Sequence, residues 1–168
     1  MNAAVNLGSI AIAGGILWLN VRPWWKGGRD PKALIPYSAG STIGALSTIC
    51  VGGALGWGAS GIAGLASTAG SKGVSSATGQ SSASALPTGS MGTLTPEGAV
   101  VTVLILVGVA LLHRSSGKQD RRRILGGCVT FAILAFLPGV AGALQWLPDL
   151  VNEAGARAVE ALSKGSTS

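Results

Sequence analysis

Charged side chains are scarce in this sequence. Asp, Glu, Lys and Arg make up 11% of its 168 residues, whereas they supply about a quarter of an average soluble domain. Apolar residues reach 48%, and several uncharged stretches approach the roughly 20 residues that a helix needs to cross a bilayer. The composition therefore argues against an ordinary soluble domain and predicts an integral membrane protein.

Catalytic residues and motifs are equally sparse. The sequence has one histidine, and its two cysteines, Cys50 and Cys128, lie in apolar stretches without metal-ligand spacing. It has no GxSxG, HExxH or GxxxxGKS/T pattern. The longest apolar stretches also lack the internal charges that usually mark ion pathways and coupled transporters. We expect no enzymatic activity, no cofactor, no metal and no small-molecule substrate.

Four apolar stretches have the length and character of membrane helices, at residues 3–21, 38–57, 97–113 and 124–147. They predict an all-α integral membrane fold with four transmembrane helices arranged as two hairpins. The first stretch has no basic residue before it, so we expect it to be retained and not removed as a signal peptide.

The remaining segments are placed by their composition. We expect a first hairpin over residues 1–66, a flexible Ser/Gly-rich loop over 67–95, a second hairpin over 96–148 and a tail over 149–168. Thr95, Pro96 and Glu97 are typical of a helix start. Pro138 predicts a kink in the fourth helix, and Pro148 predicts its end. Helical spacing of apolar residues in the tail predicts a short amphipathic helix at the membrane surface.

Basic residues are distributed unevenly along the chain. Nine of the twelve Lys and Arg residues fall in two short turns, at residues 22–32 and 114–123. Such turns face the cytoplasm in most membrane proteins, which predicts a multi-pass protein of the cell membrane with both termini outside the cytoplasm. The second turn either only sets this orientation or also contacts anionic lipid, an acidic protein or, non-specifically, DNA. Its basic residues are Arg114, Lys118, Arg121, Arg122 and Arg123.

Small residues recur at every fourth position from the second apolar stretch onward. Small side chains let helix backbones approach closely in lipid, so this row predicts a packing face. The face serves either packing within one chain or self-association of several copies into an oligomer or a pore. The row comprises Gly40, Gly44, Thr48, Gly52, Gly56, Ser60 and Gly64.

Three segments of the sequence carry a family resemblance. LNVRPWWKGGRDPKALIPY, GTLTPEG and ALQWLPDLVNEAG occur in this order, with the Ser/Gly-rich loop between the first two. In this arrangement the chain resembles the spread proteins of conjugative plasmids and integrative elements of mycelial bacteria such as Streptomyces. The resemblance implies a membrane protein that assists passage of a transferred element through the recipient mycelium, together with a septal DNA translocase or other spread proteins. It implies no active site.

We therefore predict a non-enzymatic component of a membrane channel or scaffold that works with a DNA translocase. The main alternative is a phage-type holin or another self-associating pore former. Holins often keep a charged C-terminal tail in the cytoplasm, whereas this tail is predicted to lie outside. A subunit related to conjugative pilins and a transporter are further alternatives.

Overall fold

The described part of the chain, residues 3–50, 53–78 and 92–165 of a computed structural model, is helical throughout apart from short connections. It contains seven α-helices and one 3₁₀-helix, η1. Their bounds are α1 Ala3–Lys26, η1 Pro31–Leu34, α2 Ile35–Ile49, α3 Gly53–Thr78, α4 Pro96–Ser115, α5 Lys118–Leu134, α6 Pro138–Ala143 and α7 Trp146–Gly165.

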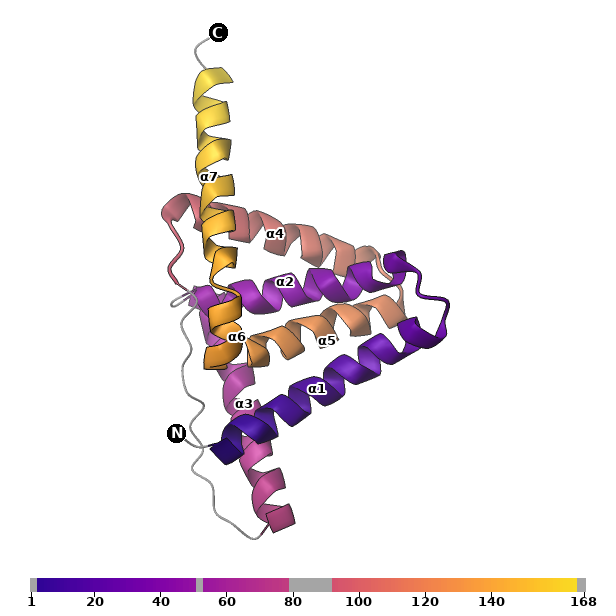
Figure 1. Ribbon diagram of the computed structural model, residues 1–168. Helices are drawn as coiled ribbons and strands as arrows, with labels where there is room; N and C mark the ends of the chain where they lie inside the picture. The colour runs from indigo at the N-terminus through magenta and orange to yellow at the C-terminus, as the bar shows by residue number, and fades with distance from the viewer. Residues whose placement is uncertain (1–2, 51–52, 79–91, 166–168) are drawn as a thin grey trace.

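Four of these helices lie side by side, and two others run across one end of them (Figure 1). Helix α5 contacts both α1 and α2, and α2 also contacts α4. At one end, α3 packs across α1 and α7 packs across α4. The two basic turns, from α1 to η1 and from α4 to α5, lie at the opposite end (Figure 1).

The prediction of four transmembrane helices in two hairpins is wrong. In the described part of the chain, α4 is the one helix that is both long and apolar enough to cross a membrane. Its 20 residues carry no charged side chain between Glu97 and His113. At a rise of about 1.5 Å per residue, α4 reaches about 30 Å, which matches the hydrocarbon core of a bilayer.

The second predicted span is broken in the middle. Helix α2 has 15 residues and ends at Ile49, where Cys50 takes an extended conformation with φ −71° and ψ 98°. A helix of that length reaches only about 22 Å. Helix α3 then begins at Gly53 and contains many Gly, Ser and Thr residues in place of larger apolar ones.

The fourth predicted span is also divided. Helix α5 starts at Lys118 and ends at Leu134, so its first two turns are filled with charged residues. A turn then precedes Pro138, which opens the six-residue helix α6. The chain therefore breaks where a kink was predicted. Pro148 does not end a helix either, since it lies in the first turn of α7.

Other predicted boundaries have mixed outcomes. Residues 67–78 belong to α3 and not to a flexible loop, while residues 79–91 of that predicted loop lie outside the described residues. The predicted helix start at Thr95 is confirmed, because its hydroxyl oxygen accepts a hydrogen bond from the Gly98 N–H at 3.1 Å. A helix is also present in the tail, as α7.

The closest helix contact is made by glycines of α2 and α5. A Cβ atom added to Gly40 or Gly44 would overlap a backbone carbonyl oxygen of α5, and one added to Gly127 would overlap the carbonyl oxygen of Tyr37 in α2. Beyond this contact, Leu46 of α2 is buried in an apolar core. That core also contains Ala45, Ile49, Ala135, Ala141, Leu147 and Val151.

An added methyl group should destabilise this glycine contact but not an open helix surface. We expect Gly44→Ala to lower the free energy of unfolding by about 1–3 kcal/mol, because the added carbon forces α2 away from α5. Gly108→Ala is the matched control, since a Cβ there meets no atom within 4 Å and improves helix propensity. Thermal unfolding in detergent, followed by circular dichroism, measures both. Equal stability of the two variants would contradict this account of the packing.

Candidate functional site

The first basic turn is held in place by its own hydrogen bonds. The carboxylate of Asp30 accepts from the backbone N–H of Lys32 at 2.9 Å and so caps η1. The carbonyl oxygen of Asp30 accepts from the indole N–H of Trp24 at 2.8 Å. The guanidinium of Arg29 lies 4.4 Å from the ring centre of Trp25, within the range of a cation–π contact. The turn thus has a defined shape and an exposed basic surface.

The second basic turn depends on Arg121. Its Nη2 donates to the carbonyl oxygen of Arg114 at 2.7 Å, and its Nε donates to that of Ser116 at 3.0 Å. The last carbonyl oxygens of a helix have no N–H donor within that helix, so a cationic side chain that donates hydrogen bonds satisfies them. Arg121 therefore fixes the end of α4 against the start of α5.

Arg123 joins the two basic turns to each other. Its Nη1 donates to the carbonyl oxygen of Ala33 in η1 at 3.1 Å and lies 3.5 Å from Oδ1 of Asp120. The side chain is 15% exposed, so its guanidinium is largely fixed by these partners. Residues 90 positions apart in the sequence are thus held together at the basic end of the molecule.

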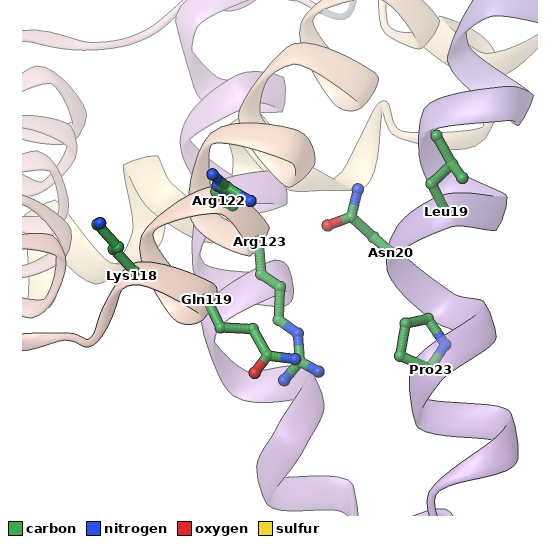
Figure 2. A pocket seen from close by; sticks show the side chains of 7 residues that line it. All are labelled: Leu19, Asn20, Pro23, Lys118, Gln119, Arg122 and Arg123. Carbon is green, nitrogen blue, oxygen red and sulfur yellow. The ribbon is translucent and has the colours of Figure 1, made fainter.

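A cleft of about 460 Å³ lies between α1 and α5 at this basic end (Figure 2). Figure 2 shows the amide of Asn20 pointing from α1 toward α5, where it packs against Gly126. The α5 wall is mainly cationic, and the α1 wall is mainly apolar. The lining residues are Leu19, Asn20 and Pro23 of α1 and Lys118, Gln119, Arg122 and Arg123 of α5.

The chemistry of this cleft suits an anion. Three cationic side chains, Lys118, Arg122 and Arg123, line it together with the amides of Asn20 and Gln119, and no carboxylate lines it. Arginine and lysine donate charge-assisted hydrogen bonds to phosphate or carboxylate oxygens. The nearest acid in the sequence, Asp120, is paired with Arg123.

The five predicted basic contact residues have different positions. Lys118, Arg122 and Arg123 line the cleft. Arg121 is used to hold the end of α4, and Arg114 is exposed in the last turn of α4 outside the cleft. Sequence reasoning missed the wall contributed by α1, because it assigned Leu19 and Asn20 to a membrane span. The polar side chain of Asn20, three positions before Pro23 in an otherwise apolar stretch, was the available signal.

The small-residue row does not form one continuous face in the described residues. Gly40 and Gly44 pack against α5, and Thr48 donates a hydrogen bond to the carbonyl oxygen of Ala45 at 2.7 Å. Gly52 lies outside the described residues. Beyond the break, the remaining members of the row belong to α3. Gly56 and Ser60 line a hollow that Trp57 and, from α2, Thr48 also line, and Gly64 is exposed.

The two cysteines, Cys50 and Cys128, are free thiols. Burial raises the pKa of both the Cys50 and the Cys128 thiol, which keeps each protonated at neutral pH and weakly reactive. In the described residues, no group of three or more His, Cys, Asp or Glu side chains has a metal-binding arrangement.

Comparison of the chain with protein-family models, with curated proteins and with solved structures finds no match. The candidate site therefore has to be interpreted from its own geometry.

The bridge from Arg123 to η1 leads to a local prediction. Arg123→Gln removes the charged donor to Ala33 and the ion-pair partner of Asp120, so the backbone amides of residues 32–35 should exchange hydrogen at least about tenfold faster. Arg122→Gln removes the same charge from an exposed neighbour and should leave that exchange unchanged. Hydrogen-exchange mass spectrometry reads both, and equal exchange in the two variants would show that the bridge does not order η1.

Proposed function

We propose that this chain is a non-enzymatic membrane protein whose α4 lies in the bilayer and whose basic end contacts an anionic partner. The apolar surface of α4 carries this proposal. Its outward side chains are between 50% and 64% exposed, and they are Val100, Val103, Leu104, Val107 and Leu111.

Water is an unfavourable surrounding for that surface. Each of these side chains gains about 1.5–3 kcal/mol when it is fully transferred to an apolar medium. A contiguous exposed apolar surface of this kind marks a site of membrane or protein contact. Lipid tails can surround this surface without leaving backbone polar groups unpaired, because every backbone hydrogen bond of a helix is internal.

The position of the charges supports the same arrangement. Helix α4 ends in His113 and Arg114, and the second basic turn follows at once. Basic residues at the end of a membrane helix place that end on the cytoplasmic side. The exposed cations there are then available to a cytoplasmic partner.

The biological role that we propose comes from the resemblance to spread proteins. In that role the chain is a scaffold or channel component that assists transfer of a mobile element within the recipient mycelium, with a DNA translocase as its partner. Self-association through exposed helix surfaces belongs to the same proposal. The absence of catalytic motifs from the sequence supports a structural role.

A holin or another pore former is the second candidate. The exposed surface of α4 favours it, because a second copy of the chain covers such a surface as well as lipid does. Rapid collapse of the membrane potential after expression, followed with a potential-sensitive dye, would favour this candidate. An unchanged potential at high expression would exclude it.

If α4 lies in the bilayer, the effect of an added charge on membrane association should depend on its depth along the helix. Leu104→Arg places a charge near the middle of α4 and should move the protein from the membrane fraction to the soluble or aggregated fraction, since a central arginine costs about 2.5–3.5 kcal/mol. Leu111→Arg makes the same change two turns later on the same face, where the side chain reaches the interface, and should remain in the membrane. Fractionation with an alkaline carbonate wash tests this. Wild-type protein in the soluble fraction would overturn the proposal.

The partner is tested by pull-down of the membrane-extracted protein. A variant with Arg114, Lys118 and Arg122 changed to Gln spares Arg121 and Arg123, which hold the turns. It should recover at least about fivefold less DNA translocase or DNA than wild type, because charge-assisted contacts are lost. The control variant changes Lys72, Arg157 and Lys164 to Gln, three cations of α3 and α7 that lie outside the basic end, and should keep the wild-type recovery. Recovery of nothing but copies of the chain by the wild type would contradict the scaffold role.

A further inference from the structure

We infer that the cleft between α1 and α5 binds the phosphate headgroup of an anionic phospholipid. This inference rests on the proposed membrane insertion of α4 and adds a ligand class to the basic end. The cleft has a cationic wall that suits the phosphate of such a lipid and an apolar wall that suits its glycerol and upper acyl carbons.

The two walls present matching helical faces. On α5, Lys118 and Gln119 are followed one turn later by Arg122 and Arg123, so all four side chains lie on one side of the helix. On α1, Leu19 and Asn20 are followed one turn later by Pro23. Figure 2 shows Asn20 of α1 and Gln119 of α5 extending into the space between the two helices, whereas Lys118 extends along the outer edge of the cleft, away from α1.

The cationic wall is arranged for a phosphate before any ligand arrives. Arg123 is held by Ala33 and Asp120, and its side chain is only 15% exposed. Little side-chain entropy is therefore lost when it contacts an anion. Lys118 and Arg122 are exposed at the same wall and complete a group of three positive charges.

The opposite wall distinguishes a lipid from a free anion. Leu19 is 68% exposed, and its neighbour Trp18 is 65% exposed. A free phosphate uses only the cationic wall, whereas a phospholipid also lays its glycerol and upper acyl carbons against Leu19 and Pro23. The apolar wall thus favours a ligand that is anionic at one end and apolar at the other.

A second surface on α1 supports a lipid over a nucleic acid. Trp18, Val21, Arg22, Trp25 and Lys26 line a hollow on the adjacent face of the helix. Tryptophans interleaved with basic residues are typical of the interface between headgroups and acyl chains. The α5 wall of the cleft starts at Lys118, three residues after Ser115, the last residue of α4. This places the cleft at the level of the headgroups if α4 is inserted.

The test uses the full chain in neutral detergent and measures binding of short-chain phospholipids by thermophoresis. We expect phosphatidylglycerol to bind at least about tenfold more tightly than phosphatidylcholine, because two or three nearby cations favour a lipid with a net negative charge by at least that factor. Arg122→Gln combined with Lys118→Gln should abolish most of this preference. Arg114→Gln combined with Arg157→Gln removes the same charge outside the cleft and should preserve it.

Two further measurements distinguish a phospholipid headgroup from free inorganic phosphate as the ligand. Leu19→Ser should weaken phosphatidylglycerol binding, and an excess of inorganic phosphate should not displace the lipid. Displacement by inorganic phosphate alone, with no effect of Leu19→Ser, would overturn the lipid assignment in favour of a simple anion site. Binding of a short DNA duplex at the cleft with no preference for anionic lipid would also overturn it.

The result is independent of the test of the proposed function. Equal loss of lipid preference in the two charge variants would reduce the cleft to diffuse electrostatic attraction and overturn the inference, while carbonate-resistant membrane association of wild type would still support insertion of α4. Release of wild-type protein from membranes by carbonate would instead count against the proposed function itself, whatever the lipid titration gives.

Discussion

The backbone contact between α2 and α5 is the constraint on which the basic end of the molecule depends. Gly40, Gly44 and Gly127 bring the two helices so close that carbonyl oxygens fill the space where side chains would otherwise lie. This contact sets both the distance and the register of the helices. Because η1 directly precedes α2 and the second basic turn includes the start of α5, the same contact brings the two turns together.

Arg123 completes what the glycine contact begins. The carbonyl oxygen of Ala33 is within reach of its guanidinium only because α2 and α5 are already in register. Positive charges that would repel one another are thereby held at one end of the fold, partly offset by Asp30 and Asp120. Helix α1 packs on α5 and supplies the apolar wall of the cleft.

Features that depend only on residues close together in the sequence were predictable from it. The start of α4 follows from Thr95 and Pro96, whose capping roles need no tertiary structure. The small residues at 40 and 44 were predicted to suit close approach, with packing within one chain and self-association both left open. In the fold these two glycines lie against the backbone of α5. The helical character of the tail was also visible in its spacing.

The errors have a common physical origin. Hydropathy sums over a window and does not detect a backbone that leaves the helix, so the break at Cys50 and the turn before Pro138 were absorbed into longer spans. Charge counting likewise treated the five basic residues as equivalent. Their roles differ because Arg121 and Arg123 find backbone carbonyls that only the fold brings near.

The hydrogen bonds of Arg121 also limit how this protein can evolve. Only Ser116 and Gly117 separate α4 from α5, and Arg121 reaches back seven positions to the carbonyl oxygen of Arg114. An insertion or deletion in this connection would have to be absorbed by a turn with no spare length. Divergent descendants of this chain should therefore conserve the spacing between these two positions, and that spacing, together with the glycines of α2 and α5, is a signature by which distant homologues can be recognised.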